Sequence, residues 1–240
     1  MKLQSAIHAL YPPQCLTCGA ETAEDFSLCG GCWREMPFIT GLVCDACGVP
    51  LAGEGSGERV HCDACMMAPH LWSRGRAPLL YQGTARSMIL AFKHGDRHDY
   101  LKPMAQWMVM QARVITGADV LIAPVPLHRH RLFRRRFNQA ALLGARMARL
   151  MNADFCPDLL IRTRATRPHQ GMSRVERFEN QRAAYQVPQS RQKLLKGREL
   201  LLVDDVMTSG ATLAACAEAC FDAGVLAVNV TVLARVASDT

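Results

Sequence analysis

The residues whose types and spacing most clearly indicate chemistry lie near the carboxyl-terminal end of the chain. The apolar run at 201–203 predicts a buried strand that delivers two carboxylates, Asp204 and Asp205, at its end. Residues 208–212 read Thr-Ser-Gly-Ala-Thr and open a predicted helix. Backbone amides at a helix N-terminus bind phosphate, loop hydroxyls can donate to it, and a glycine lets the backbone come close. The pattern predicts a site for a phosphorylated sugar, with the carboxylates placed for vicinal hydroxyls.

Two simpler interpretations cover only part of this stretch. Adjacent acids after an apolar strand also occur in ATPases, but no GxxxxGK[ST] loop precedes Asp204. A solvated Asp-Asp turn with a helix cap explains the two acids and leaves the hydroxyl-rich loop unexplained. The expected phosphate-binding residues are therefore Thr208, Ser209, Gly210, Ala211 and Thr212.

Cysteines indicate a second kind of site at the other end of the chain. Eight of the eleven cysteines form four CxxC pairs before residue 66. Each pair can turn two thiolates toward one metal ion, and two pairs complete a tetrahedral zinc site. Cys-Leu-Thr-Cys-Gly at 15–19 recurs as Cys-Asp-Ala-Cys-Gly at 44–48, which favours two ribbons in sequence. We expect two structural zinc ions, one held by Cys15, Cys18, Cys29 and Cys32 and the other by Cys44, Cys47, Cys62 and Cys65.

Other arrangements of these cysteines stay open at this point. A cross-braced pairing would join the first CxxC with the third and the second with the fourth. Redox chemistry at a CxxC pair usually needs a strand-to-helix context, which these Gly- and Pro-rich segments do not offer. A catalytic zinc needs an open coordination position, and four thiolates leave none. A segment of about 65 residues with little apolar core needs a metal to fold, so a structural role is favoured.

Composition and charge exclude several classes of protein. Half of the 240 residues are hydrophobic and a fifth are charged, which is typical of globular domains and not of disordered or fibrous chains. No apolar run approaches the 18 or so residues of a membrane span. The first eight residues lack the apolar stretch of a secretory signal, so we expect a cytoplasmic protein. The net charge of +7 favours an anionic partner without identifying it.

The elements that position these residues follow from hydrophobic periodicity. Alternation of strands and helices predicts an α/β fold with a doubly wound, mostly parallel sheet, whose ligands lie at the carboxyl ends of the strands. We expect a domain at 71–240, preceded by a small double zinc ribbon at 1–70. Cys216 and Cys220 are expected in the core of the domain at 71–240. The predicted strands cover 78–81, 120–126, 199–203 and 225–233. The predicted helices are a stretch through Met88, Ile89 and Phe92, two helices over about 100–115 and 211–223, and a further helix with Phe137, Ala141, Gly144, Ala148 and Met151 on one face.

The stretch 201–213 resembles the phosphoribosyl pyrophosphate (PRPP) binding motif of type I phosphoribosyltransferases at nearly every defining position. That resemblance implies contacts of Asp204 and Asp205 with the ribose hydroxyls. It also implies that residues 208–212 surround the 5′-phosphate. A type I phosphoribosyltransferase-like sheet is the fold that it implies.

Several further motifs follow one another along nearly the whole chain. They are the cysteine knuckles, Pro124-Val125-Pro126-Leu127-His128, Arg135-x-Phe137-Asn138-Gln139, Gln170-Gly171-Met172-Ser173 with Glu176-Arg177 and Asn180, and the stretch 201–213. This order resembles the competence protein F (ComF) family, which includes the GntX-like proteins. Family members join an amino-terminal zinc ribbon to a phosphoribosyltransferase-like domain and are associated with the uptake of DNA in natural transformation or the use of external DNA. Arg136 stands where the family usually has a glycine.

The resemblance gives the basic residues a role. The run at 128–136 by itself indicates a solvated basic surface, but in a phosphoribosyltransferase-like sheet this loop faces the pyrophosphate, whose charge needs cationic donors. Arg131 and Arg135 are the candidates there, Lys93 is a further one, and Mg²⁺ accompanies the PRPP. A second basic stretch at 162–170 is expected to be a mobile lid over the site, or alternatively a contact for nucleic acid.

Hypotheses from different classes follow. The first is a phosphoribosyltransferase, or an enzyme-derived PRPP-binding protein, with displacement of pyrophosphate at the ribose C1 as its chemistry. The acceptor is not indicated. The second is a non-catalytic DNA-handling accessory protein that binds single-stranded DNA or a partner in the DNA-uptake machinery. A structural adaptor assembled through the zinc ribbons is the third.

Overall fold

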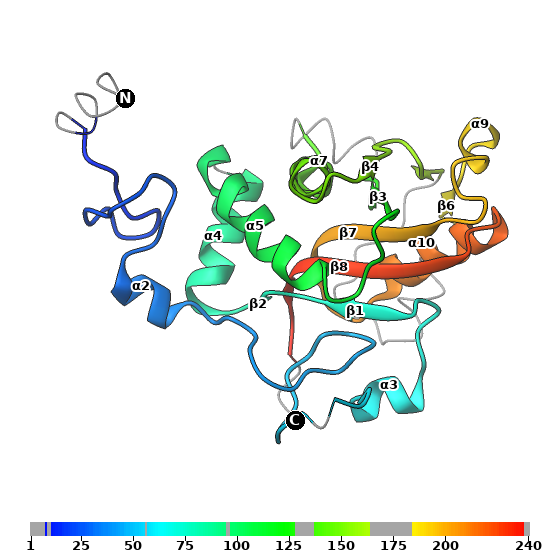
Figure 1. The fold of residues 1–240 in the computed structure, drawn as a ribbon, viewed down its shortest axis with the longest axis horizontal. Coiled ribbons are helices and arrows are strands. Elements are labelled where there is room, and N and C mark those ends of the chain that lie inside the picture. Colours follow the sequence, from blue (N-terminus) through cyan, green and yellow to red (C-terminus); the bar gives the residue numbers. More distant parts are fainter. Residues whose placement is uncertain are drawn as a thin grey trace.

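The computed structural model describes residues 8, 11–55, 57–94, 97–127, 137–163 and 184–237. Six described strands form one sheet in which every pairing is parallel, with the order β1-β8-β7-β3-β4 and β2 paired with β8 beyond β1. Figure 1 shows the long strands β7 and β8 at its centre. The strands are β1 (Arg74–Arg76), β2 (Leu79–Leu80), β3 (Leu121–Pro124), β4 (Asp154–Phe155), β7 (Glu199–Met207) and β8 (Ala227–Arg235).

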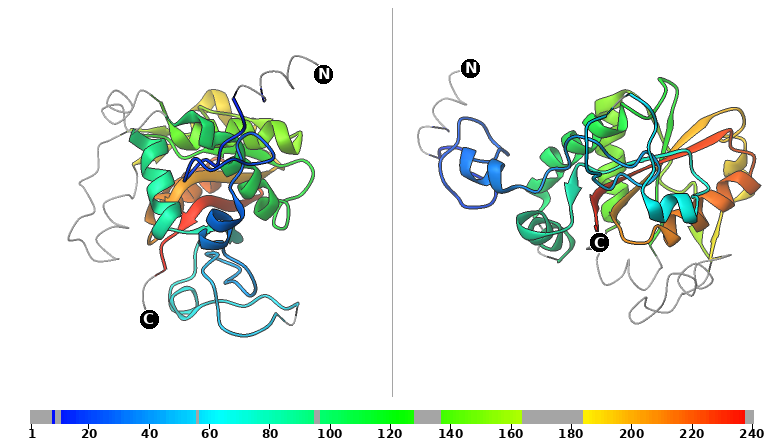
Figure 2. Two further views of the ribbon diagram at one scale, coloured as in Figure 1. Left: turned by 90° about the vertical axis from the view of Figure 1, so that its left-hand side faces the viewer. Right: turned by 90° about the horizontal axis from the view of Figure 1, so that it is seen from below.

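Helices cover both faces of this sheet, as expected for a doubly wound fold. Side chains alternate along β7 because successive residues of a strand point to opposite faces. Leu200 and Leu202 belong to the buried cluster that includes α10 (Ala211–Asp222). Leu201 and Val203 belong to the cluster on the opposite face; Figure 2 shows the ribbon of the sheet and of the helices on that face from two further directions. That face carries α4 (Gly83–His94), the 3₁₀ helix η1 (His98–Tyr100), α5 (Leu101–Ala112) and α7 (Gln139–Met151).

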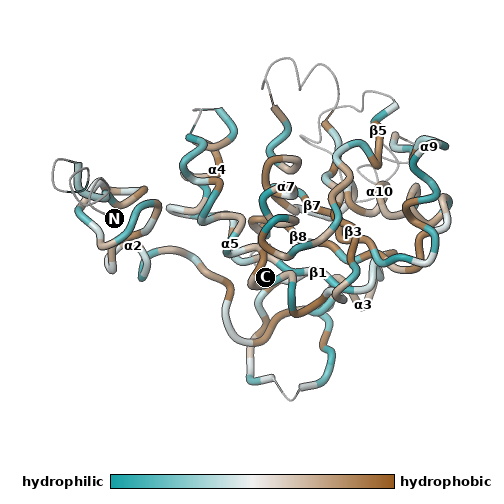
Figure 3. Tube along the Cα trace, turned by 45° about the horizontal axis from the view of Figure 1, so that its top comes forward, coloured by the Kyte–Doolittle hydropathy of each residue, from teal (hydrophilic) through white to brown (hydrophobic). Residues whose placement is uncertain are grey.

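A short pair of strands lies beside α10. The strands β5 (Ile161–Arg162) and β6 (Tyr185–Gln186) form an antiparallel pair, and α9 (Gln189–Gln192) follows β6. Cys216 and Cys220 of α10 are fully buried, as expected for core residues. Figure 3 shows hydrophobic residues concentrated along the central strands. Among the described helices, none has the length and apolar character needed to cross a membrane.

The boundaries of β7 and the buried face of α7 differ from the sequence-based expectation. Strand β7 continues to Met207, so Asp204 and Asp205 lie within the strand and not after it. The parallel neighbour β8 extends the ladder there, with Met207 opposite Arg235. On α7, Gly144 and Ala148 are buried as expected, but the buried stripe also contains Ala140, Leu143 and Met147, whereas Phe137, Ala141 and Met151 are only half-buried.

The physical reason for the altered face of α7 lies at its N-terminus and at β4. The side chain of Asn138 accepts a hydrogen bond from the backbone N–H of Ala140 at 3.0 Å, which caps the helix and leaves Phe137 outside it. The ring of Phe155 lies against Gly144, where an added Cβ would come within 2.9 Å of Cε2. The contact between Phe155 and Gly144 cannot be inferred from the periodicity of one helix.

The two ribbons contact different parts of the sheet domain. The first, with α2 (Gly30–Glu35), meets η1 through the carbonyl of Leu16, which accepts from Arg97 at 3.2 Å and from Tyr100 at 3.1 Å. The second, with α3 (Asp63–Met67), packs on β1, and its cysteines share a buried cluster with α10. Figure 1 shows the first ribbon beside α4 and α5 and the second below β1. The domain boundary between residues 70 and 71 stays a prediction.

Candidate functional site

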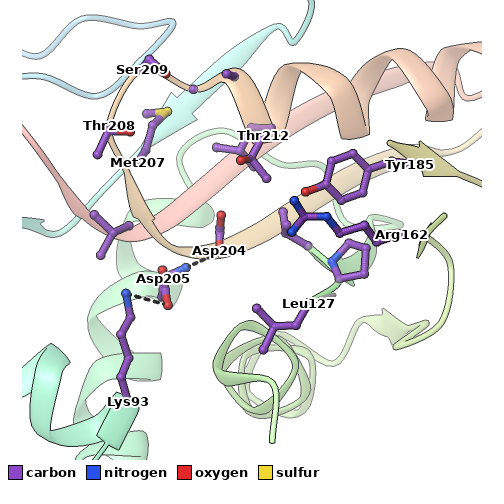
Figure 4. Close-up of a pocket in the computed structure, with 16 residues that line it drawn as sticks. Lys93, Leu127, Arg162, Tyr185, Asp204, Asp205, Met207, Thr208, Ser209 and Thr212 are labelled. Atoms are coloured by element: carbon purple, nitrogen blue, oxygen red, sulfur yellow. Dashed lines mark hydrogen bonds and ion pairs between the residues drawn. The ribbon is translucent and has the colours of Figure 1, made fainter. Parts of the chain in front are cut away.

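A pocket of about 200 Å³ lies where the sheet meets the turn between β7 and α10. Figure 4 shows the side chains around it, which come from α4, β7, the loop after β3 and the β5–β6 pair. Ligands of doubly wound sheets bind at the carboxyl ends of the strands, and this pocket occupies that position. Its lining residues are Lys93, Val125, Pro126, Leu127, Arg162, Tyr185 and the continuous stretch 204–213.

The acid pair lines this pocket together with a cation. The Nζ of Lys93 lies 2.8 Å from the Oδ2 of Asp205, and the two side chains are 12% and 16% exposed. The Oδ1 of Asp204 accepts a hydrogen bond from the backbone N–H of Asp205 at 2.8 Å. The Coulomb attraction between two side chains this shielded from solvent is screened less than that of an exposed pair. The pocket thus presents acceptors for hydroxyls beside a donor for an anion.

The predicted phosphate loop is a tight turn from the end of β7 into α10. Gly210 occupies the N-cap position with a φ of +78°, a backbone conformation that favours glycine. The guanidinium of Arg235 supports the turn from β8 by donating to the carbonyls of Met207 at 3.2 Å and Thr208 at 2.7 Å. Because the first amides of a helix have no intrahelical partner, the 12-residue α10 offers donors at the pocket.

The tightness of this turn predicts an unequal cost for two glycine substitutions. Gly210→Ala and Gly224→Ala both place a Cβ on a residue with positive φ (+78° and +86°), which costs about 1–2 kcal/mol. Only at Gly210 does the new Cβ meet another group, the ring of Trp72 at 2.8 Å. Overpacking of that kind adds about 1–3 kcal/mol. Calorimetry should give the lower Tm for Gly210→Ala, and equal Tm values would contradict this description of the turn.

Two residues of the β5–β6 pair complete the pocket: Arg162, which begins the basic stretch expected over the site, and Tyr185, which sequence reasoning did not assign there. The guanidinium of Arg162 lies 5.4 Å from the centroid of the Tyr185 ring. Burial raises the pKa of Tyr185, which keeps the phenol neutral. Figure 4 shows both side chains on the pocket side of the pair, facing α10. Arg162 was expected in a mobile lid, whereas it lies in β5. Tyr185 belongs to a two-residue strand without a motif, so the sequence carries no signal for it.

Several predicted residues lie outside the described part of the chain. They are Arg131 and Arg135, Arg136 at the position of the family glycine, the rest of the basic run at 128–136, and residues 164–170 of the second basic stretch. Of the three cations expected near a pyrophosphate, the structure therefore places only Lys93.

The eight CxxC cysteines lie in two groups that follow the sequential order and not the cross-braced one. Cys15, Cys18, Cys29 and Cys32 bring their Sγ atoms within 4.8 Å of one another, and so do Cys44, Cys47, Cys62 and Cys65. The Sγ–Sγ separations of Cys18–Cys29 and Cys47–Cys62 are 3.7 and 3.8 Å. A tetrahedron with zinc–sulfur bonds of about 2.3 Å has an edge of about 3.8 Å. Four thiols at this spacing therefore fit a zinc ion in each group.

Backbone donors also point at the sulfur atoms of the first group. The amide of Cys29 donates to the Sγ of Cys15 at 3.2 Å, and the amide of Cys32 lies 3.5 Å from the Sγ of Cys29. Such hydrogen bonds stabilise thiolates, the form in which cysteine binds metal.

Comparison with known proteins gives a consistent assignment of both parts. A family model described as a double zinc ribbon domain matches residues 6–66, and one described as a phosphoribosyl transferase domain matches residues 138–240. DNA utilization protein YhgH of Escherichia coli (strain K12) is 28% identical over 230 residues, covering 93% of this chain and 97% of its own length. Competence protein F of Haemophilus influenzae is 27% identical over 213 residues, covering 87% and 90%.

A solved structure overlaps the chain more loosely. Glutamine phosphoribosylpyrophosphate amidotransferase from B. subtilis covers 60% of this chain and 30% of its own, with 15% identity and a TM-score of 0.40. A likeness at this level supports no inference about the site.

Proposed function

We propose that this chain, a member of the ComF family that joins a double zinc ribbon to a phosphoribosyltransferase-like domain, binds PRPP in the pocket at the end of β7. One observation carries the proposal: two adjacent carboxylates, a lysine and a glycine-containing helix N-terminus line a single pocket. PRPP combines vicinal hydroxyls, a 5′-phosphate and a pyrophosphate, and each of these groups finds a chemical complement there.

Each group of the ligand has a partner in this proposal. Asp204 and Asp205 accept hydrogen bonds from the ribose hydroxyls. The amides and hydroxyls of residues 208–212 bind the 5′-phosphate. Lys93 and Arg162 supply positive charge to the pyrophosphate, and Arg131 and Arg135 are further candidates for that role.

A transfer reaction would proceed by displacement at the ribose C1. The bond from C1 to the pyrophosphate oxygen breaks with its electron pair leaving on the oxygen, and an acceptor nucleophile forms the new bond to C1. Mg²⁺ bound to the pyrophosphate would neutralise part of the leaving-group charge. The chain's own contribution is to hold the ribose through the acid pair and to place cations beside the departing oxygens.

Calorimetric titration of the full chain with PRPP and Mg²⁺ tests the binding step. We expect saturable binding with one PRPP per chain, and weaker binding of ribose 5-phosphate and of pyrophosphate alone, because each lacks part of the complement. Absence of binding at millimolar PRPP would refute the proposal. Release of pyrophosphate on addition of candidate nucleobases or amines then tests turnover separately.

Zinc content is the second expectation, and it follows from the geometry of the two cysteine groups. Protein purified without chelator should contain about two zinc ions per chain, measured by atomic emission. Removal of the metal by a strong chelator should unfold the ribbon segments, because the ion is what holds four thiols together in each of them. A content of one zinc or none would contradict the assignment of two structural sites.

A second candidate function rests on the relatives' names, DNA utilization protein and competence protein, and on the net charge of +7. In this candidate the chain takes part in DNA uptake or in the use of external DNA and contacts single-stranded DNA. Binding of labelled single-stranded DNA, measured at several salt concentrations, tests it. Direct contact with single-stranded DNA would be excluded if no binding is seen at low salt, or if the affinity does not change with salt concentration.

A further inference from the structure

Trp72 joins the second cysteine group to the phosphate loop. Its indole Nε1–H donates to the carbonyl of Ala46 at 2.6 Å, and Ala46 lies within the knuckle between Cys44 and Cys47. The far end of the same ring lies against Gly210, where an added Cβ would be 2.8 Å from Cη2. Trp72 is only 3% exposed. One rigid side chain therefore spans from a predicted zinc knuckle to the N-cap of α10.

The knuckle end of this connection is held in place from several sides. The amide of Gly48 donates to the carbonyl of Cys44 at 2.8 Å, and the amide of Gly75 donates to the carbonyl of Asp45 at 2.9 Å. A Cβ on Gly75 would lie 2.4 Å from the carbonyl oxygen of Ala46, so β1 touches the acceptor of the indole directly. The acceptor for Trp72 is therefore positioned by the turn of the knuckle together with its contact to β1.

The loop end depends on that ring. Gly210 has a positive φ, and a glycine loses more conformational freedom on folding than any other residue. The ring edge of Trp72 fills the space beside Gly210, and His70, which is stacked on Trp72 with 3.9 Å between ring centroids, lies next to it. The two rings leave the turn little space into which it could relax. Arg235 holds the preceding carbonyls of Met207 and Thr208. Together they confine the amides of the loop to one arrangement.

We propose that Trp72 is a positioning residue for the phosphate loop, which makes the geometry of residues 207–213 depend on the second cysteine group and not on the first. The ribbon of the first group contacts η1 instead, through the carbonyl of Leu16, which accepts from Arg97 and Tyr100. The part of the inference that concerns affinity for PRPP rests on the proposed function. The part that concerns the conformation of the loop can be tested without any ligand.

Hydrogen exchange on Trp72→Phe tests the connection directly. Phenylalanine keeps a buried ring and removes the Nε1–H donor and the far end of the indole. The readout is the amides of residues 214–216, which close the loop onto α10 and are called the loop amides below; that of Ala214 donates to the carbonyl of Gly210 at 2.9 Å. They should exchange at least tenfold faster than in the parent, while those of α7 stay unchanged. Trp107→Phe is the matched control, because Trp107 is also buried but packs with Trp33 and Phe38. The dissociation constant for PRPP should rise about tenfold in Trp72→Phe and stay constant in Trp107→Phe.

A comparison of the two cysteine groups provides an independent test. Cys29 and Cys62 are both half-buried N-cap residues of short helices, so Cys29→Ser and Cys62→Ser are matched disruptions. We expect Cys62→Ser to speed exchange of the loop amides as Trp72→Phe does, and Cys29→Ser to leave them unchanged. The combination of Cys62→Ser with Trp72→Phe should add little to either alone, because both act through the same contact.

The outcomes separate the inference from the proposed function. Equal loop exchange in Cys29→Ser and Cys62→Ser, or an unchanged loop in Trp72→Phe, would overturn the positioning role. Loss of protection in α7 as well would also overturn it, because the effect would then be global unfolding. If the parent chain does not bind PRPP but Trp72→Phe still speeds exchange in the loop, the proposal of PRPP binding is refuted and the positioning role of Trp72 stands.

Discussion

Replacing Asp204 and Asp205 together with asparagine is expected to weaken PRPP binding by about ten- to a hundredfold. The amide oxygens still accept hydrogen bonds, but a neutral acceptor contributes about 1 kcal/mol less than a charged one at each position. The fold should persist, because β7 is anchored by the buried Leu200, Leu201 and Val203. Calorimetric titration with PRPP and Mg²⁺ measures the change.

This experiment needs a control for the loss of two negative charges as such. Asp119→Asn with Asp222→Asn removes the same two charges from exposed positions outside the pocket lining. This variant should bind PRPP as the parent does, and both variants should keep about two zinc ions. Parent-like affinity in the pocket variant would show that the ribose assignment is wrong. Single-stranded DNA binding should be retained or slightly strengthened in both, because lost negative charge reduces repulsion of phosphates.

Asp45→Asn is expected to destabilise the folded chain by about 3–5 kcal/mol, the usual cost of removing one partner from a buried ion pair. The carboxylate of Asp45 is buried, and its Oδ1 lies 3.0 Å from the Nη2 of Arg74 and 2.5 Å from the Nη2 of Arg76. Arg76 is itself only 8% exposed, so the substitution leaves a buried guanidinium without its counter-charge. The pair ties the second knuckle to β1. A chain of this size loses roughly 2–4 °C of Tm per kcal/mol, which makes the effect large in a thermal scan.

The same pair predicts a pH dependence with a defined sign. Burial of Asp45 tends to raise its pKa, but hydrogen bonds and charge from Arg74 and Arg76 prevail and hold the pKa below its ordinary value of 3.8. A depressed folded-state pKa contributes stability above the unfolded-state pKa and loses it as pH falls. The parent should therefore lose more stability than Asp45→Asn between about pH 5 and pH 2.

Asp99 provides the matched comparison for Asp45. It also pairs with an arginine, Arg97, at 2.7 Å, but both side chains are about a third or more exposed. Exposed pairs contribute about 1 kcal/mol or less. Asp99→Asn should therefore shift the Tm by only a few degrees, and a shift as large as that of Asp45→Asn would contradict the role assigned to burial.

The cysteine groups and the phosphate loop were predictable because their geometry is local. A CxxC turn directs two thiols to one point whatever surrounds it, and the repeat of 15–19 at 44–48 indicated which pairs belong together. The loop after β7 is equally local, since the glycine and the helix N-terminus that we expect to bind phosphate lie within a few residues of each other. The doubly wound parallel sheet followed from strand and helix alternation, and the structure confirms it.

Errors in the sequence interpretation came from interactions between elements. The end of β7 was placed too early because its last residues pair with β8, and a polar pair such as Asp204-Asp205 hides that continuation. The face of α7 was shifted because Asn138 caps the helix and the ring of Phe155 fills the space over Gly144. Neither partner can be identified from spacing along one segment.

The sequence by itself therefore determined which groups this chain presents: two sets of four thiols, an acid pair and a hydroxyl-rich loop with a glycine at a helix N-terminus, all fixed by spacing within a few residues. Only the tertiary structure decided which distant groups join them. Lys93 reaches Asp205 across more than a hundred residues, Tyr185 enters from a two-residue strand, and Trp72 bridges a knuckle to Gly210. These contacts depend on strand register and on the packing of helices against the sheet, and a pattern within one segment contains neither.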